Sequence, residues 1–311
     1  MSSELPASQR IVSIDALRGF DMFWIIGGDV LATAQLHWGN CPASSLLSQQ
    51  LEHVAWEGFR FYDLIYPLFL FLVGCVLPYS LDKYRSRPAM AYWRITRRTI
   101  SLVLLGMLAN ELMQFDWANM RWAGVLQRIG ICYGIAALIY LHARPRTQLI
   151  LCATILLGYW ALLVWVPVPG RTGDVFSMPW NLAGYIDRTV LPGKILKPYY
   201  GWGDNEGILS TLPAIVTTLL GAQAGLWLRS AHSPWKKVGG LVCAGVVCLA
   251  VGWAWGLVFP IIKNIWTSSF VLVAAGWSLL LLALFYAVID VLGYRKWAFF
   301  FIVIGMNAIT I

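Results

Sequence analysis

Charged residues are scarce in this chain. Asp, Glu, Lys and Arg make up 12% of its 311 residues, whereas hydrophobic residues make up 59%. An ordinary soluble domain carries about 25% charged residues, so the composition excludes that class and indicates a membrane protein. Nucleic-acid binding is not expected either, because no soluble basic domain is present to carry the formal net charge of +8.

Several motifs of known chemistry are also missing. No Walker loop, GxSxG nucleophile elbow or dinucleotide fingerprint occurs. The six cysteines form no CxxC pair and five of them fall in apolar runs, so we expect structural thiols and no metal site. No signal peptide is expected, because residues 1–10 are polar and the first apolar run is too long and lacks a cleavage site. No clear internal repeat is found, which weakens the case for an inverted-repeat transporter.

Long apolar runs dominate the sequence. A helix of about 20 apolar residues crosses a bilayer. Nine runs approach that length: 16–36, 62–81, 97–114, 122–141, 148–168, 207–228, 238–260, 267–289 and 297 onward. We therefore predict an all-α, polytopic transmembrane helix bundle of about nine spans, forming one domain over residues 1–311. The last run is still apolar at Ile311, so further helices are expected after it.

The Lys and Arg residues orient this bundle. Two sets of loops alternate along the chain: 82–98, 142–147, 229–237 and 290–296 in one, and 37–61, 115–121, 169–206 and 261–266 in the other. The first set holds 13 Lys and Arg residues and the second holds 7 over a greater length. Because short cytoplasmic loops are enriched in positive charge, we predict a cytoplasmic N-terminus and two long periplasmic loops, 37–61 and 169–206. Anionic membrane lipids would attract the basic face.

The first run contains ionisable residues, which are costly at membrane depth and are therefore candidates for function. Asp15 and Arg18 are three residues apart, so they can pair at the cytoplasmic end of the helix. Asp21 follows them. Asp29 lies about 21 Å further along a helix than Asp15, which places it near the outward side.

The stretch "LEHVAWEGFRFYDLIYPLFLFLVG", residues 51–74, puts polar groups at the start of the second run. If the segment is helical, His53 and Glu57 share a face, with Trp56 adjacent and Asp63 entering the span. Histidine accepts and returns a proton near neutral pH, as acyl transfer to an amine or alcohol requires. A carboxylate such as Asp29 can orient the imidazole. The alternative for His53 is an amphipathic residue at the membrane interface.

Gln127 and Arg128 lie about one turn inside the outer edge of the fourth run. Arg128 either extends to the interface or binds an anionic group, with Asn110 and Glu111 as candidate partners. The outward loops add further polar residues on the same face: Asp187, Arg188, Asp204, Glu206, Lys263, Asn264 and Ser268. Isolated glycines in the runs indicate close helix packing. The 17 tryptophans fit both an interfacial belt and sugar-stacking surfaces.

An ordered set of motifs extends from about residue 12 to the end: "SIDALRG", "EHVAWEGFRFYDLIYPLFLFLVG", "GVLQRIGICY", "PVPG", "AGYIDR", "NEGILSTLPAI", "GAQAG", "KNIW" and "GMN". In this order the chain resembles the heparan-α-glucosaminide N-acetyltransferase family, including its bacterial members. The resemblance implies transfer of the acetyl group of acetyl-CoA through a membrane domain onto a glucosamine amine, with His53 as the key catalytic residue. The family's partner asparagine falls on Asp29, and an ionised carboxylate accepts hydrogen bonds but donates none.

We therefore predict an acyltransferase of the bacterial inner membrane that acts on a sugar or glycan amine or hydroxyl on the periplasmic side. Its cavity would lie between the first, second and fourth spans, under loop 169–206. The predicted catalytic residues are His53 and Asp29, with His53 as a base or a transient acyl carrier. The predicted substrate contacts are Trp56, Glu57, Asp63, Asp187, Arg188, Asp204, Glu206, Lys263 and Asn264. The predicted acetyl-CoA contacts are Gln127, Arg128 and Asn307.

Two other classes of protein are compatible with the residues. A transporter or flippase of a sugar-linked or anionic solute would use Asp29, Asp63 and Arg128 as coupling charges. An inactive membrane scaffold is the third class, and it leaves the polar groups on the outward face unexplained. The sequence is compatible with a homodimer.

Overall fold

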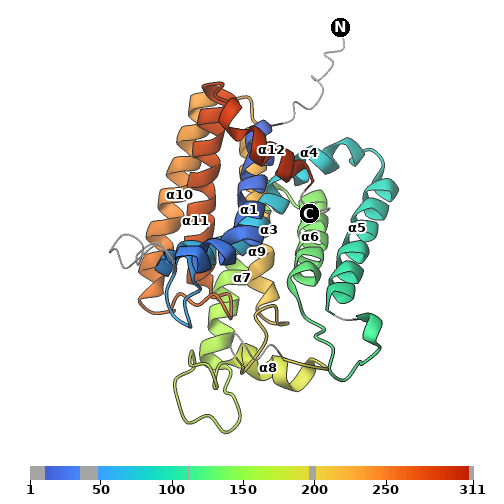
Figure 1. Ribbon diagram of the computed structural model, residues 1–311, viewed down its shortest axis with the longest axis vertical. Helices are drawn as coiled ribbons and strands as arrows, with labels where there is room; N and C mark the ends of the chain where they lie inside the picture. The colour runs from blue at the N-terminus through green and yellow to red at the C-terminus, as the bar shows by residue number, and fades with distance from the viewer. Residues whose placement is uncertain (1–10, 36–47, 111, 196–200, 308–311) are drawn as a thin grey trace.

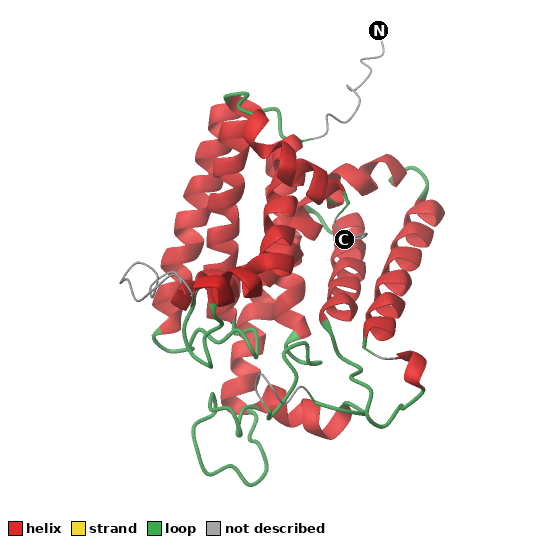
Figure 2. Cartoon of the chain, viewed as in Figure 1, coloured by secondary structure: helices red, strands yellow, loops and turns green. Residues whose placement is uncertain are grey.

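The computed structural model describes residues 11–35, 48–110, 112–195 and 201–307, without the side chains of residues 29–35 and 114. Helices and loops make up this described part of the chain (Figure 2). Its only β-type pairings are two isolated bridges, Glu57 with Ile262 and Arg121 with Gly193. The all-α prediction is therefore confirmed.

The helices have the following bounds: α1 (Val12–Gln35), α3 (Phe61–Cys75), α4 (Leu77–Leu81), α5 (Pro88–Ala109), α6 (Val125–His142), α7 (Pro145–Trp165), α8 (Leu182–Val190), α9 (Thr211–Arg229), α10 (Pro234–Gly256), α11 (Ser268–Phe285) and α12 (Phe299–Met306). Short helical turns cover Asp82–Tyr84, Leu112–Gln114, Tyr286–Val291 and Lys296–Ala298. Proline begins α5, α7 and α10, where its missing N–H has no helical partner to lose.

Six helical segments of the described chain are long and apolar enough to cross a membrane: Phe61–Tyr84, Val125–His142, Pro145–Trp165, Thr211–Arg229, Pro234–Gly256 and Ser268–Val291. The predicted count of nine spans is not confirmed. α12 is short, and the long helices α1 and α5 each carry several ionisable side chains. Apolarity alone therefore identified helices with few ionisable side chains better than the charged helices α1 and α5.

Basic loops gather at one end of the bundle, together with the start of α1 (Figure 1). There Arg229 donates to the carboxylate of Asp82 and to the carbonyl of Pro78, and the hydroxyl of Tyr140 donates to Asp82 over 2.7 Å. The predicted ion pair of Asp15 and Arg18 lies at this end, with a nitrogen–oxygen distance of 3.8 Å. α8 and the loops around it form the opposite end (Figure 1).

α3 and α9 pack closely at the centre of the bundle. A Cβ on Gly221 would lie 1.9 Å from the carbonyl oxygen of Phe71, and one on Gly74 would lie 1.8 Å from that of Thr218. Only glycine permits this approach, which confirms the prediction of close packing for these glycines. The contact fixes α3, whose first turn carries Asp63.

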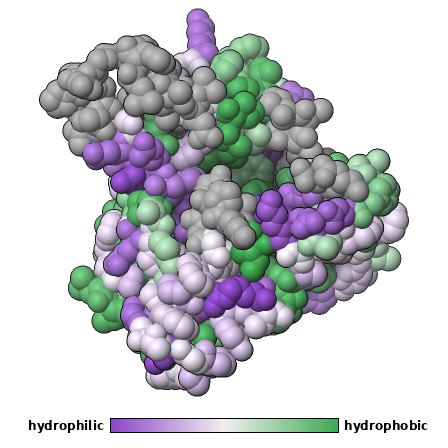
Figure 3. Space-filling view, turned by 60° about the horizontal axis from the view of Figure 1, so that its bottom comes forward, coloured by the Kyte–Doolittle hydropathy of each residue, from purple (hydrophilic) through white to green (hydrophobic). Residues whose placement is uncertain are grey.

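A second hydrophobic cluster lies near the outer end. It joins α7, α8 and the segment between α10 and α11, and contains Tyr159, Leu163, Val168, Leu182, Ala183, Phe259, Ile262 and Ile265. The hydroxyl of Tyr159 donates to the carbonyl of Ile265. The outer face around α8 is mostly hydrophilic or intermediate in hydropathy (Figure 3). The α10–α11 loop is thus held by apolar packing beside a polar face.

Candidate active site

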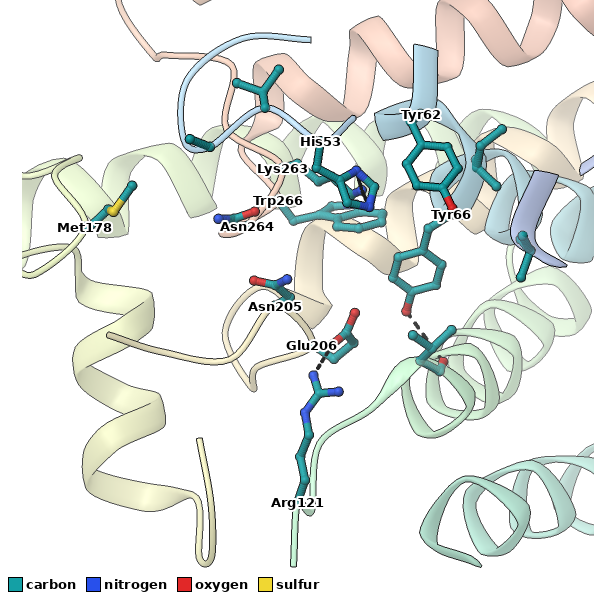
Figure 4. Close-up of a pocket in the computed structure, with 15 residues that line it drawn as sticks. His53, Tyr62, Tyr66, Arg121, Met178, Asn205, Glu206, Lys263, Asn264 and Trp266 are labelled. Carbon is teal, nitrogen blue, oxygen red and sulfur yellow. Dashed lines mark hydrogen bonds and ion pairs between the residues drawn. The ribbon is translucent and has the colours of Figure 1, made fainter. Parts of the chain in front are cut away.

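A cavity of about 640 Å³ lies beside the outer ends of α3 and α6. α1 contributes Ile25 to its wall, α3 contributes Tyr62, Ile65 and Tyr66, and α6 contributes Val125. The remaining wall comes from loops and carries most of the polar groups: His53, Val54, Ala55, Arg121, Met178, Asn205, Glu206, Lys263, Asn264 and Trp266 (Figure 4). Segments far apart in the sequence therefore meet around one space.

His53 is paired with a buried carboxylate. Its Nδ1 lies 2.9 Å from Oδ1 of Asp63, whose side chain is 1% exposed, whereas the His53 side chain is 38% exposed. An ionised carboxylate only accepts hydrogen bonds, so a proton on Nδ1 is donated to Asp63 and Nε2 is the ring nitrogen left to act as a base. Asp63 therefore holds the imidazole of His53 at the cavity wall.

The start of α3 explains the position of Asp63. The backbone N–H groups of Arg60 and Val54 donate to Oδ2 of Asp63 over 3.2 and 3.3 Å. Asp63 is the third residue of the helix, where a carboxylate satisfies the free N–H groups and interacts favourably with the helix dipole. The same side chain thus caps α3 and holds His53.

Lys263 reaches this pair from the α10–α11 loop. Its Nζ lies 3.2 Å from Oδ1 of Asp63, 2.9 Å from Nδ1 of His53 and 3.4 Å from Nε2 of His53. Burial lowers the pKa of the Lys263 ammonium group, and the negative charge of Asp63 opposes that shift. The three groups form a compact cluster of one carboxylate, one ammonium group and one imidazole.

The backbone brings the α10–α11 loop to His53. Gly58 N–H donates to the carbonyl of Ile261 over 2.9 Å, next to the bridge between Glu57 and Ile262. Thr267 closes the loop, because its hydroxyl accepts from Ile262 N–H over 3.0 Å and its own N–H donates to the Ile262 carbonyl over 3.1 Å. This short closed loop carries Lys263 at its tip.

Aromatic rings complete the wall around His53. The Tyr62 ring lies 4.7 Å from the imidazole, measured between ring centroids, and Tyr66 meets Trp266 edge to face at 5.1 Å. Trp266 has a φ of 53°, a left-handed conformation that is rare for a bulky residue. Residues held in this way cluster at functional sites, and here the turn places Trp266 below His53 (Figure 4).

Ionic contacts hold the opposite part of the wall. Arg121 donates from Nε and Nη2 to the carboxylate of Asp204 over 2.9 and 2.6 Å, and from Nη2 to Glu206. The Asp187 carboxylate accepts from the N–H groups of Asp204 and Ile208 over 3.2 and 3.0 Å. Burial raises the pKa of Asp187 to about 6. A Cβ on Gly207 would lie 2.0 Å from Asp187, so glycine is required there.

The residues predicted to bind acetyl-CoA do not share a site. Arg128 is 1% exposed, lies over the Trp266 ring at 5.1 Å, and donates to Gly207 and Ser210. Gln127 donates to the carbonyl of Trp122. Asn307 donates to the carbonyl of Val303. Gly305, two residues before Asn307, packs on Asp15 at the start of α1. Gln127, Arg128 and Asn307 therefore do not line one common space in the described part of the chain.

Asn110, one of the two suggested partners of Arg128, contacts other groups. The Asn110 amide donates to the carbonyls of Arg121 and Ala123, over 2.9 and 3.0 Å, so it supports the loop before α6. Glu111 lies outside the described residues. Arg128 donates instead to the carbonyl of Gly207 and the hydroxyl of Ser210.

Of the predicted substrate contacts, Glu206, Lys263 and Asn264 line the cavity and Asp63 lies directly behind His53. The others lie outside its wall. Trp56 donates to the carbonyl of Phe176, and Arg188 donates to those of Pro179 and Trp202, so both tie loops together. Asp187 and Asp204 shape the loop that carries Glu206.

The segment from His53 to Glu57 is not helical, because its backbone pairs with the α10–α11 loop instead. Glu57 is exposed there and does not share a helical face with His53. The side chain of Asp29 lies outside the description, but its neighbour Gly28 packs on Tyr62, 2.5 Å from where a Cβ would stand. The carboxylate seen on the imidazole is that of Asp63.

Several wall residues were absent from the sequence prediction: Tyr62, Tyr66, Arg121, Asn205 and Trp266. Tyr62 and Tyr66 are four residues apart on α3, so helical spacing could have placed both on one face beside Asp63. No comparable signal existed for Arg121 and Trp266, which lie in irregular loops.

The family model described as "Heparan-alpha-glucosaminide N-acetyltransferase, catalytic" matches residues 10–186. The chain is 28% identical to the human protein named heparan-alpha-glucosaminide N-acetyltransferase and 26% identical to the mouse protein of the same name. Each comparison covers 84% of this chain and 48% of the relative. The chain therefore spans about half the length of the curated relatives it matches. The matched region contains His53 and Asp63, whereas Glu206 and Lys263 follow it.

Proposed function

The chain belongs to the heparan-alpha-glucosaminide N-acetyltransferase catalytic family, and on this basis we propose that it transfers an acyl group from acyl-CoA to an amine or hydroxyl group of a sugar. The observation that carries the proposal is His53 at the cavity wall, with its Nδ1 on buried Asp63. Acetyl-CoA is the proposed donor, and residues 1–311 act as one transmembrane acyltransferase domain.

His53 acts as the base in this proposal. The acceptor atom attacks the thioester carbon, a new C–N or C–O bond forms, the C–S bond breaks, and Nε2 of His53 takes the acceptor proton and returns it to the thiolate. Asp63 stabilises the imidazolium while it exists. The same nitrogen can instead carry the acyl group transiently, which replaces one transfer by two.

The cavity supplies the remaining roles. The Asn264 amide and the Lys263 ammonium group lie on its wall and can donate to the oxyanion that forms at the attacked carbon. Tyr62, Tyr66 and Trp266 offer aromatic surface to a sugar ring. The basic loops at the opposite end favour the orientation in which the N-terminus is cytoplasmic and the cavity opens to the periplasm of a bacterial inner membrane.

The test is direct turnover by the purified full chain. Incubation with acetyl-CoA and a panel of amino sugars and neutral sugars, followed by free thiol and product mass, should show acetylated sugar and an equal amount of CoA. His53→Ala should reduce the rate by at least about 100-fold and keep the melting temperature near that of the wild type, since the His53 side chain is partly exposed.

Undiminished product from a folded His53→Ala variant would contradict the role of His53. Solute uptake without acyl-CoA, and without any acetylated product, would contradict acyl transfer. The transporter interpretation is not favoured, because the matched family and both relatives are named for acetyl transfer.

A further inference from the structure

Three arginines of α5 have no carboxylate partner in the described part of the chain. Arg94, Arg97 and Arg98 lie between one and three turns from the start of the helix, and no ion pair joins any of them to a described carboxylate. The carboxylate of Asp82, at the same end of the bundle, already serves two other arginines and the hydroxyl of Tyr140. Three positive charges on one helix are therefore not balanced by these residues.

These arginines lie on the exposed side of α5. Arg97 shares its face with Trp93 and Leu104, because helical residues four and seven positions apart lie above one another, and all three are exposed. The half-buried Arg98 stands in the same relation to the exposed Leu105. In a membrane the exposed apolar side chains of α5 contact lipid, so the arginines enter a lipid-facing surface.

The position of the arginine face is fixed by the contact of α5 with α6. Figure 1 shows α5 at the edge of the bundle, with α6 beside it. The Arg98 guanidinium group lies over the ring of Tyr133 in α6, 4.5 Å from its centroid. The Tyr92 hydroxyl lies 2.8 Å from Nε2 of His142 at the end of α6. A ligand on the outer side of α5 therefore meets cations whose helix is already in place, which reduces the ordering cost of binding.

The depth of these charges is unfavourable without a partner. From Arg98 to Ala109, the last residue of α5, a helix rises about 16 Å, whereas the hydrocarbon core of a bilayer is about 30 Å thick. Because α5 ends in the outer loops, its apolar part covers only about half of that core. Charged groups at such depth require hydration or an opposite charge. An anionic headgroup drawn towards the arginines supplies that charge.

We propose that Arg94, Arg97 and Arg98 form a binding site for an anionic phospholipid in the leaflet on the side of the basic loops. The guanidinium groups donate to the phosphate oxygens, for which their planar N–H groups are suited. The acyl chains lie along the exposed leucines of α5, which continue the same face towards the middle of the bilayer. Those leucines favour a lipid over a soluble phosphate. The site lies on the outside of the bundle and does not depend on the proposed function.

The experiment measures the binding of two lipids that differ in charge. The full chain in a non-ionic detergent is titrated with phosphatidylglycerol or phosphatidylcholine, and native mass spectrometry gives the Kd of each. The wild type should bind phosphatidylglycerol at least about tenfold more tightly. The combined variant Arg94→Gln, Arg97→Gln and Arg98→Gln should raise this Kd about 100-fold, because each arginine near an anionic headgroup contributes about fivefold. The Kd of phosphatidylcholine should stay within about twofold.

The matched control combines Arg144→Gln, Arg146→Gln and Lys236→Gln. These residues are exposed in the basic loops or at the adjoining helix ends, so the control removes the same charge from outside α5. It should change the Kd of phosphatidylglycerol less than about threefold, because distant exposed charges are screened. Melting temperatures identify any variant that fails to fold. Arg97→Gln alone alters an exposed side chain and should still raise the Kd about fivefold.

Equal wild-type affinity for the two lipids would overturn the site. Equal losses in the α5 variant and in the control would do the same, as would an unchanged Kd in a folded Arg97→Gln variant. Glycerol phosphate carries the anionic group without acyl chains and should not displace phosphatidylglycerol at equal concentration. Displacement would assign the three cations to a soluble anion and contradict the lipid site.

Discussion

Lys263 Nζ lies 2.9 Å from Nδ1 of His53, a residue 210 positions earlier in the chain, and 3.2 Å from Oδ1 of Asp63. The contact joins the loop before α3 to the loop before α11. The Lys263 ammonium group thereby lies next to the buried carboxylate of Asp63 and next to the partly exposed imidazole of His53. Its strength can be measured separately from any catalytic role.

Lys263→Met should lower the free energy of unfolding by about 3 kcal/mol, because it leaves the Asp63 carboxylate buried without its ammonium partner. The double variant Lys263→Met with Asp63→Asn should recover part of this loss, since the unpaired charge is then absent. Thermal or denaturant unfolding of the wild type, both single variants and the double variant measures the coupling. Strictly additive losses would show that the two side chains do not interact.

Asp63→Asn should reduce acetyl transfer about 100-fold or more, because a neutral amide cannot stabilise the imidazolium of His53. The helix cap is partly kept, since the amide oxygen still accepts one N–H. The Lys263 ammonium group loses its carboxylate partner, so the loss of stability should be about 3 kcal/mol. Initial rates and melting curves give both values. Glu57→Gln is the control, because this exposed carboxylate lies in the same loop and should leave the rate unchanged. Similar losses in the two variants would argue against a specific role of Asp63.

Gly221→Ala should destabilise the bundle by about 2 kcal/mol, because its Cβ meets the Phe71 carbonyl at 1.9 Å and forces α3 and α9 apart. Gly158→Ala in α7 is the matched control, since nothing lies within 4 Å of its Cβ. That change should leave the melting temperature unchanged or slightly higher, because alanine favours helix. Equal melting temperatures for the two variants would contradict the packing argument.

The stability of the fold should depend on pH through Asp187. Burial raises its folded-state pKa from 3.8 to about 6, so the folded protein binds this proton more tightly than the unfolded chain does. The resulting stability, roughly 3 kcal/mol, is present below about pH 4 and is lost as the pH rises through about 6. Melting temperatures from pH 4 to 7.5 should therefore fall more steeply for the wild type than for Asp187→Asn. A constant difference between the two curves would rule out this assignment.

The helical bundle could be predicted from the sequence. A membrane-spanning helix makes all its backbone hydrogen bonds within its own segment, so a long apolar run is enough to indicate one. The sequence also predicted His53 and Lys263 as site residues. It did not predict their contact, which depends on the pairing of Gly58 with Ile261 and on the closed turn at Thr267. Such loop geometry has no periodic pattern. Trp266 was missed for the same reason, because its left-handed backbone is set by the turn.

The error at Glu57 has a different origin. A spacing of four residues indicated a shared helical face, but α3 begins only at Phe61, where Asp63 can cap it. The carboxylate next to His53 therefore comes from the helix that follows. The sequence predicts Asp63 as a substrate contact, whereas the structure places it behind His53. Capping explains why it turns back towards the loop.

Residues from both halves of the sequence build the cavity wall. His53 and Asp63 belong to the first half of the sequence, whereas Asn205, Glu206 and Trp266 belong to the second. Under the proposed function, substitutions in the second half would change the wall that faces the acceptor while the imidazole–carboxylate pair stays intact. Chimeric proteins that exchange the segment after α8 should inherit acceptor preference from the donor of that segment.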